Sequence, residues 1–545
     1  MFSLGWTIDM EWAEMKDRRY TLSDFLRYAA ERHPERMAIF YEDRAITYRR
    51  LDQMSSEFAS GLLKMGICKG DRVGLYMPNF PEWIVAFFGI ARMGGIVVPM
   101  NTRYRAKEVE YIMNNSEATA LVMTSEFMKI DYIEVLDGLR GKVPNLRKII
   151  VLGDRISEGM DTFESVMELG SHHSDHSELL GIESSIMEED VVFILYTSGT
   201  TGEPKGAMLT NLNITKNAEQ TAEAIDQNVK DVTLIVVPFF HCFGCVIGIT
   251  ACVSGSSGMV PMPSYDAEQA LMYMEMFNIS IVHGVPTMFI GYLEALKKRN
   301  YDLGSVRTGV MAGAPCPVEI MKGASDKMGA NIVIAYGLTE ASPVITMTSL
   351  TDDLRDRVET VGRALPEQDV RIVDDDNMVL PPGATGELVV RGYNVMKGYF
   401  KKPEETAEAI DEEGFLHSGD LAVMDERGYY RIVGRKKDMY ICGGFNVYPR
   451  EIEEFLFKLN AVENVSVVGV PDPKFGEVGM AVIKVTEGER VTEEEIINYC
   501  KVNLANFKVP RYVWFVDDLP MTQSGKVQKF RLREMAVEEF GLKGS

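Results

Sequence analysis

Hydroxyl side chains, glycines and a lysine are concentrated between Tyr196 and Gly206, in the segment YTSGTTGEPKG. The segment begins where the apolar run VVFILY ends, and such runs are typical of strands buried on both faces. Glycines let backbone amides approach a phosphate, hydroxyl groups donate to its oxygens, and a lysine supplies positive charge. A surface turn uses the same residue types but does not account for the buried strand before it. The segment predicts phosphate binding by Thr197, Ser198, Gly199, Thr200, Thr201, Gly202 and Lys205.

The P-loop is the other phosphate-binding segment to consider, and its spacing does not fit. A P-loop ends in Gly-Lys-Ser/Thr, which places a hydroxyl next to the lysine for the magnesium ion. Here Pro204 precedes Lys205 and Gly206 follows it. The phosphate-binding chemistry must therefore belong to a different scaffold.

A second polar segment, AYGLTE at 335–340, lies at the end of another apolar run, NIVIAY at 331–336. A nucleoside triphosphate needs a metal ion to offset its charge, and the Glu340 carboxylate is a hard oxygen ligand suited to Mg²⁺. In isolation, Leu-Thr-Glu would instead indicate the capped start of a helix. Both polar segments follow strand-like runs, where open α/β sheets place their ligands.

Taken together, these segments resemble the motifs of the adenylate-forming superfamily, which includes acyl-CoA synthetases, firefly-type luciferases and peptide-synthetase adenylation domains. The matching segments, in order along the chain, are YTSGTTGEPKG, Gly313-Ala314-Pro315, AYGLTE, His417-Ser418-Gly419-Asp420, Gly434-Arg435 and Gln523-Ser524-Gly525-Lys526. The resemblance covers nearly all of the chain. Within the superfamily, PFFHCFGC, HGVPTMF and GRKKDMYICGGFNVYPREIEEF look most like medium-chain fatty acyl-CoA synthetases.

The resemblance implies a nucleotide site and its metal. Tyr336 would stack on adenine, with Gly337 beside it, and Glu340 would hold Mg²⁺. Asp420 would accept hydrogen bonds from the ribose hydroxyls, a geometry that suits a carboxylate. Its motif carries Ser418 where the family has threonine, a mild departure. The other residues implied at this site are Gly313, Ala314 and Pro315 beside the adenine, Thr339 at the α-phosphate and Arg435 behind Asp420.

The resemblance also implies how adenylation is catalysed. Lys526 matches the family's catalytic lysine, which would stabilise the negative charge that gathers when a carboxylate attacks the α-phosphorus. Thr339 and Glu340 would assist as catalytic residues, and His241 would gate access for the acid. By its residue type alone, a single surface lysine would be taken as a solvated side chain.

The acyl chain is expected along FFHCFGCV at 239–246, with contacts to Phe240, His241, Cys245 and Val246. Cys242 and Cys245 form a Cys-x-x-Cys, but no second pair is present for a zinc site, and no thioredoxin-like setting supports a redox dithiol. No charged residue lies between Pro238 and Cys252, which favours an alkyl or simple aryl tail. We expect a medium- to long-chain fatty acid; an aryl, alicyclic or branched short acid is the alternative.

Coenzyme A is the expected acyl acceptor. The resemblance places the hinge of a rotating C-terminal domain at Lys437 and the thiol's approach at Gly443-Gly444. No carrier-protein domain is visible downstream, so free coenzyme A is favoured over a carrier. An oxygen-using luciferase and a non-catalytic nucleotide or fatty-acid binding protein are the competing hypotheses. Joint retention of Lys205, Glu340, Asp420, Arg435 and Lys526 argues against the latter.

The pattern of the whole chain predicts an α/β fold that can position these segments. Strand-like runs, including VGLYM at 73–77 and IVVPM at 96–100, alternate with helical periods such as the one from Leu51 to Met65. This alternation predicts a large N-terminal domain of parallel or mixed sheets, at 1–434. Short hairpin-like segments after about residue 360 predict a small β-barrel-like part. Residues 435–545 are expected to form a small, mobile α+β domain.

Composition limits the partners and the compartment. A net charge of −23 argues against a nucleic-acid partner, which would require clustered basic residues. No signal peptide is evident, and the run at 83–91 is too short to span a membrane, which leaves peripheral membrane contact open. Seven scattered cysteines indicate a reduced, cytoplasmic protein. His172, His173 and His176 are taken as a solvated loop, no function is assigned to His33 and His283, and the oligomeric state is undetermined.

Overall fold

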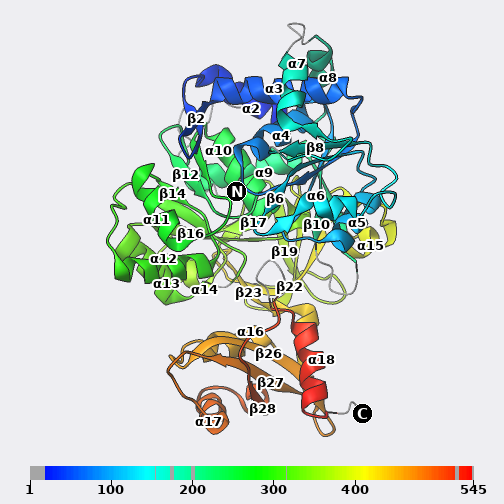
Figure 1. The fold of residues 1–545 in the computed structure, drawn as a ribbon. Helices are drawn as coiled ribbons and strands as arrows, with labels where there is room; N and C mark the ends of the chain where they lie inside the picture. The colour runs from blue at the N-terminus through cyan, green and yellow to red at the C-terminus, as the bar shows by residue number, and fades with distance from the viewer. Residues whose placement is uncertain are drawn as a thin grey trace. The chain divides into compact units, whose positions relative to one another are not determined.

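A computed structural model describes residues 19–153, 155–171, 177–197, 203–314, 316–521 and 527–542 (Figure 1). They form two compact units. The first comprises Met1–Asp369 and Val390–Leu416, and the second comprises Val370–Val389 and His417–Ser545. The domain boundary predicted between residues 434 and 435 remains a prediction.

A nine-stranded sheet in the first unit has the order β18-β17-β16-β15-β14-β12-β13-β1-β2. Its strands from β16 to β1 run parallel, and β17, β18 and β2 are antiparallel additions at the edges. The strands are β1 (Met37–Tyr41), β2 (Arg44–Thr47), β12 (Val232–Ile235), β13 (Gly258–Pro261), β14 (Ile281–Val282), β15 (Thr308–Met311), β16 (Asn331–Gly337), β17 (Val344–Met347) and β18 (Arg363–Ala364).

The two faces of this sheet are covered by different helices. Helices α11 (Ala267–Met276), α12 (Pro286–Lys298) and α13 (Val318–Met328) pack on the face that includes Leu234 and Ile332. The opposite face, which includes Ile281 and Val333, packs against Ala224 and Ile247. These two residues come from helix α9 (Asn211–Ala224) and from a π-helix, η2 (Phe243–Thr250). Because both faces are covered, its central strands are continuous apolar runs.

A second sheet, of eight strands, has the order β21-β11-β10-β4-β3-β5-β8-β9. The strands from β10 to β9 are parallel, and β11 and β21 are antiparallel to their neighbours. The strands are β3 (Arg72–Tyr76), β4 (Ile96–Pro99), β5 (Ala120–Thr124), β8 (Lys148–Leu152), β9 (Asp161–Thr162), β10 (Val191–Thr197), β11 (Lys205–Thr210) and β21 (Gly398–Tyr399). A separate hairpin pairs β6 (Glu126–Phe127) with β7 (Ile130–Asp131).

Helix boundaries follow local capping chemistry. Helix α3 (Tyr48–Lys64) begins where the Thr47 side chain accepts a hydrogen bond from the Arg50 amide. Helix α4 (Pro81–Arg92) begins with proline at its first turn and is buried along nearly its whole length. The remaining helices of this unit are α2 (Leu22–Arg32), α5 (Ala106–Asn115), α6 (Tyr132–Asp137), α7 (Phe163–Ser171), α8 (Ser177–Ser184), α10 (Ala251–Ser254), α14 (Leu354–Glu359), α15 (Pro403–Ala409) and the short η3 (Thr339–Ala341).

The second unit contains two smaller sheets. A four-stranded sheet has the order β19-β20-β22-β23, and a five-stranded sheet has the order β25-β24-β27-β26 with β28 paired to β27. Helices α16 (Pro449–Leu456) and α18 (Lys529–Glu539) pack against β26 (Figure 1). The other elements are β19 (Gln368–Val373), β20 (Thr385–Gly392), β22 (Leu416–Met424), β23 (Tyr430–Arg435), η4 (Lys436–Asp438), β24 (Tyr440–Cys442), β25 (Phe445–Val447), β26 (Val462–Asp472), β27 (Gly476–Val485), α17 (Glu493–Asn503), η5 (Asn506–Lys508) and β28 (Tyr512–Phe515).

The α/β fold class predicted from the sequence is confirmed, with large mixed sheets followed by a smaller α+β part. The segment predicted to be barrel-like contains the four-stranded sheet. All seven cysteines are free thiols. Among the described residues, no helix combines the length and the apolar character needed to cross a membrane.

Candidate nucleotide and acyl site

The predicted phosphate-binding segment connects the two strands of an antiparallel hairpin. Strand β10 pairs with β11 so that Thr197 lies opposite Lys205 and Tyr196 lies opposite Gly206. This register brings the first hydroxyl and the lysine of the motif side by side at the end of the sheet. Ser198, Gly199, Thr200, Thr201 and Gly202 lie outside the described residues.

Glu340 is the point where this hairpin meets the AYGLTE segment. The Thr197 hydroxyl donates a hydrogen bond to Oε1 of Glu340 at 3.4 Å. The Tyr399 hydroxyl donates to the same oxygen at 2.9 Å. The Lys205 ammonium lies 5.1 Å from the centroid of the Tyr399 ring. A hydroxyl, a cation, a carboxylate and a phenol thus converge from four separate elements, β10, β11, η3 and β21.

The remaining residues of the predicted adenine site lie at the carboxyl ends of two neighbouring parallel strands. Strand β15 ends at Met311, shortly before Gly313 and Ala314, and strand β16 ends with Tyr336 and Gly337. A side chain at Gly337 would place its Cβ 1.7 Å from the Pro343 carbonyl oxygen, so this close approach requires glycine. The carboxyl edge of an open α/β sheet is the usual place for a ligand. Pro315 lies outside the described residues.

The predicted acyl segment is held in place by a side chain from the loop that follows β3 of the eight-stranded sheet. The Asn79 amide group donates to the Val237 carbonyl at 3.0 Å, and its oxygen accepts from the Phe239 amide at 2.8 Å. The chain then enters η2, where a Cβ at Gly244 would lie 2.1 Å from the Pro238 carbonyl oxygen. Asn79 therefore fixes the backbone immediately before Phe240 and His241.

Within this segment, Phe240 and His241 are partly exposed, whereas Cys245 and Val246 are fully buried. Burial raises the pKa of the Cys245 thiol well above its usual value. Because the thiolate is the form that binds metals and attacks disulfides, this burial argues against a metal-binding or redox role for Cys245. The Cys242 sulfur lies 3.6 Å from the Thr339 hydroxyl, so the acyl segment directly contacts the predicted phosphate site.

In the second unit, Asp420 and Arg435 are cross-strand partners on β22 and β23. Their side chains form an ion pair at 3.4 Å, in which Asp420 is buried and Arg435 is half exposed. The Ser418 hydroxyl donates to the Leu388 carbonyl at 2.6 Å and accepts from the Asp420 amide at 3.1 Å. Serine therefore supplies the hydroxyl contacts that shape this turn.

Glu387 organises the same turn, and sequence analysis did not single it out. Its Oε1 accepts from the Gly419 amide at 3.0 Å, and its Oε2 pairs with Lys436 at 3.2 Å. His417 Nδ1 lies 3.4 Å from the same carboxylate. The only sequence signal was its position in an apolar strand, where a glutamate is out of place unless paired.

The predicted hinge and thiol-approach residues lie on short elements of this unit. Lys437 is the middle residue of η4, and Gly443 and Gly444 form the turn between β24 and β25. Both glycines have positive φ, 57° and 87°, which side chains rarely adopt. Lys526 lies outside the described residues, between Met521 and Val527, which pair as an antiparallel bridge.

The sequence matches the model of the AMP-binding enzyme over residues 26–400 and that of the AMP-binding enzyme C-terminal domain over residues 451–526. The chain belongs to the AMP-binding enzyme family. Within this family it is an AMP-forming acid–thiol ligase of the acyl-CoA synthetase type.

Three relatives of this AMP-binding enzyme show how far the similarity extends. The Bacillus subtilis protein YngI, named as an acyl-CoA synthetase, is 44% identical over 96% of this chain and 98% of its own. The mitochondrial medium-chain acyl-CoA ligase ACSF2 of Macaca fascicularis is 35% identical over 96% and 88%. The crystal structure of the anthranilate CoA ligase AuaEII with anthranoyl-AMP superposes with a TM-score of 0.85, at 26% identity, and covers 96% of this chain and 98% of that one.

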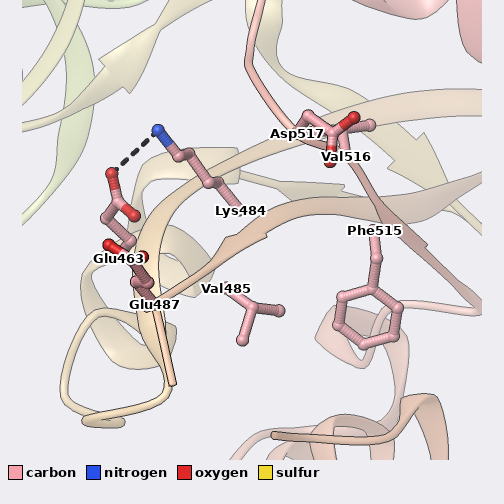
Figure 2. A pocket seen from close by; sticks show the side chains of 7 residues that line it. All are labelled: Glu463, Lys484, Val485, Glu487, Phe515, Val516 and Asp517. Atoms are coloured by element: carbon pink, nitrogen blue, oxygen red, sulfur yellow. Dashed lines mark ion pairs between the residues drawn. The ribbon is translucent and has the colours of Figure 1, made fainter. Parts of the chain in front are cut away.

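An open depression of about 580 Å³ on the second unit of this AMP-binding enzyme does not fit a nucleotide. Lys484 is its cation, and it is already paired with Glu463 at 2.9 Å and with Asp518 at 3.0 Å. The remaining charged residues of the lining are carboxylates, which would repel phosphate. Figure 2 shows the lining, which consists of Glu463, Lys484, Val485, Glu487, Phe515, Val516 and Asp517.

Proposed function

We propose that this enzyme activates a medium- to long-chain fatty acid with ATP and transfers the acyl group to coenzyme A. In the first step a carboxylate oxygen attacks the α-phosphorus of ATP, which forms acyl-AMP and releases pyrophosphate. In the second step the thiol of coenzyme A attacks the acyl carbon, and AMP leaves. The observation that carries this proposal is the contact between Thr339 of the phosphate site and Cys242 of the uncharged acyl segment, at 3.6 Å.

The side chains around Glu340 suit the first step. Lys205 and the hydroxyls of Thr197 and Thr339 offer a cation and donors to phosphate oxygens, and such preorganised donors stabilise developing charge. Within the described part of the chain, both hydrogen bonds given above for the Glu340 carboxylate are made to Oε1, and Oε2 is the oxygen that we propose for a cation. Glu340 is therefore the residue that would hold Mg²⁺, which offsets the charge of the triphosphate. We assign catalysis at the α-phosphate to Lys526.

Coenzyme A as acceptor is supported by the surface around the Gly443-Gly444 turn. The rings of Phe445 and Phe507 stack with centroids 4.6 Å apart and planes inclined by 14°. Lys508, which pairs with Glu451 at 2.6 Å, lies 5.7 Å from the Phe507 ring. Arg511, which pairs with Asp472 at 3.4 Å, lies 5.9 Å from the ring of Phe475. The exposed aromatic faces suit stacking with the adenine that coenzyme A carries.

A fatty acid is supported by the acyl segment itself. Cys245, Val246 and Ile249 are fully buried, and no charged residue lies between Pro238 and Cys252. Each methylene removed from water contributes about 0.8 kcal/mol, so affinity should rise with chain length until the available space is filled. The ACSF2 relative is named for medium-chain acids, which agrees with this expectation.

An aryl acid is the second candidate. The partly exposed rings of Phe240 and Phe243 offer stacking faces within the acyl segment, and the structurally similar AuaEII binds an aryl adenylate. Free thiols at all seven cysteines support a reduced compartment, and we propose the cytoplasm.

A panel of acids separates these candidates. Saturated acids of increasing length, benzoate, anthranilate and a dicarboxylate would each be mixed with ATP, Mg²⁺ and coenzyme A, with AMP and the thioester measured by mass spectrometry. We expect the rate to rise with alkyl length and then to fall sharply. A preference for anthranilate or benzoate would favour the aryl acid, and a preference for dicarboxylic acids would contradict both. A protein that binds ATP but releases no pyrophosphate with any acid would be a binding protein.

A further inference from the structure

Tyr399 belongs to none of the motifs described above, yet its backbone is fixed next to the phosphate hairpin. It lies on the edge strand β21, where it pairs with Ala207 of β11. Its amide donates to the Thr406 hydroxyl at 2.9 Å, and its carbonyl accepts from the Lys402 amide at 3.1 Å. Because Lys205 and Ala207 are two residues apart on β11, their side chains share one face of the sheet. This register brings the Tyr399 side chain beside Lys205.

The two ends of the Tyr399 side chain contact opposite charges. Its hydroxyl donates to Oε1 of Glu340 at 2.9 Å, and its ring lies 5.1 Å from the Lys205 ammonium. Lys205 and Glu340, both among the described residues, form no ion pair with each other.

We propose that Tyr399 is a positioning residue of the adenylation site, which separates Lys205 from Glu340 and so keeps the cation available for phosphate and the carboxylate available for a metal ion. This inference rests on the proposed function. An ammonium and a carboxylate close enough to pair would neutralise each other and would compete with the nucleotide for both groups. A ring face attracts the lysine without neutralising it, and the hydroxyl satisfies only one of the two carboxylate oxygens.

Two substitutions separate the two contacts. Tyr399→Phe keeps the ring under Lys205 and removes the donor to Glu340. Since a hydrogen bond to a charged group is strong, we expect the Mg²⁺ concentration for half-maximal adenylation to rise roughly ten-fold or more. Tyr399→Leu removes both contacts and lets Lys205 pair with Glu340, so the KM for ATP should also rise.

Tyr393 provides a matched control within the same unit. Its ring lies 5.1 Å from Lys216, and its hydroxyl donates to Gln220 at 2.6 Å. Tyr393→Phe therefore removes a similar buried hydrogen bond near a similar lysine, but one whose acceptor is Gln220 and not Glu340. We expect it to leave the Mg²⁺ dependence unchanged.

The test uses the full-length chain and two readouts. Calorimetric titration of a non-hydrolysable ATP analogue, with and without Mg²⁺, measures binding independently of turnover. Transfer from synthetic acyl-adenylate to coenzyme A measures the second step, which should be unchanged in Tyr399→Phe.

Unaltered Mg²⁺-dependent binding in Tyr399→Phe would overturn the inference. An equal loss in both steps would also overturn it, because it would indicate a structural role. If Tyr399→Leu does not fold, Tyr399→Phe decides alone. If the wild type binds Mg²⁺ and the analogue but makes no acyl-CoA, the proposed function fails while the binding test of Tyr399 still stands.

Discussion

His283 is a buried histidine beside the acyl segment, and burial sets its charge. Its Nδ1 accepts a hydrogen bond from the Val310 amide at 3.1 Å, which places the proton on Nε2. Nε2 has no hydrogen-bond partner among the described residues. The ring lies 6.1 Å from that of Phe243. Removal from water lowers the pKa of His283 to about 3, so the imidazole is neutral at physiological pH.

This depressed pKa predicts a loss of stability in mild acid. Below the ordinary value of about 6.5 the unfolded chain binds a proton at His283 that the folded chain excludes. The stability is therefore complete above pH 6.5 and falls as the pH drops toward 3. One such group costs about 2 kcal/mol between pH 6.5 and pH 5. His283→Asn keeps an acceptor for Val310 but does not titrate, so its free energy of unfolding in urea should depend less on pH. Equal pH slopes for the two proteins would contradict this.

Ser418 stands where related motifs carry threonine, and its contacts predict which substitutions it tolerates. Its hydroxyl donates to the Leu388 carbonyl and accepts from the Asp420 amide. Ser418→Thr keeps both contacts and should retain the wild-type KM for ATP. Ser418→Ala removes the hydroxyl that the Leu388 carbonyl and the Asp420 amide contact, which should lower the free energy of unfolding by about 1 kcal/mol. Because Asp420 would then be held less firmly, the KM for ATP should rise. Thermal melts and initial rates check both variants, and wild-type kinetics in Ser418→Ala would remove Ser418 from the site.

The residues that form the candidate site differ in how readily they can be predicted from the sequence. Thr197, Lys205 and Glu340 could be predicted because residue type and order in the motifs reveal their chemistry. Tyr399 and Asn79 could not, because each acts through a partner that only the fold brings near. Tyr399 is 59 positions from Glu340, and Asn79 is 160 positions from Phe239. No local pattern encodes such pairs.

Among the elements, the connection from β3 to the acyl segment depends on one side chain, that of Asn79. Asn79 follows β3 of the eight-stranded sheet and bonds in both directions to the chain just after β12 of the nine-stranded sheet. It is 3% exposed, so water cannot easily replace its hydrogen bonds. One amide side chain thus holds the backbone that leads into η2.

Asn79→Leu should therefore impair binding of the acid more than binding of ATP. Each buried group left without its partner costs about 1–3 kcal/mol, and the freed segment should raise the KM for the acid about ten-fold or more. Asn217 provides a contrast, because it bonds in the same two ways to Val344, with distances of 2.8 and 3.1 Å. Asn217→Leu should cost similar stability but leave the KM for the acid unchanged. Equal effects of both variants on the acid would show that Asn79 acts only through stability.

The elements themselves were predicted unevenly, for physical reasons. Strands such as β3, β10 and β16 could be predicted because burial on both faces selects continuous apolar runs. Strand β11 begins within the phosphate motif and depends on pairing with β10, so its composition gave no signal. The π-helix η2 depends on close packing, since a Cβ at Gly248 would lie 2.9 Å from Ile235. Tertiary contacts, which no local propensity records, determine both elements.

For the whole molecule, the proposed reaction requires that an acidic chain bind anionic substrates and that its C-terminal domain move between the two steps. The net charge of −23 repels anionic substrates, so ATP and coenzyme A must be held by local cations and amides. Lys205 lies in the first unit, and Lys508 and Arg511, each paired with a carboxylate, lie in the second. The resemblance to adenylate-forming enzymes implies that the C-terminal domain turns about Lys437 between the two steps. If the enzyme works in this way, single substitutions should block one of the two reaction steps and leave the other intact.

Lys437→Pro and Lys526→Ala should give opposite defects. Proline fixes φ at residue 437 and restricts the residue before it, so the rotation needed for the second step is hindered. Acyl-adenylate should then form and accumulate while acyl-CoA is delayed. Lys526→Ala removes the charge proposed at the α-phosphate, which is worth ~3 kcal/mol or more, so adenylation should fall about 100-fold or more while transfer from synthetic acyl-adenylate persists. Single-turnover quenching with radiolabelled acid resolves both species. Normal acyl-CoA production by Lys437→Pro would contradict the rotation, and an equal loss of both steps in Lys526→Ala would make that lysine structural.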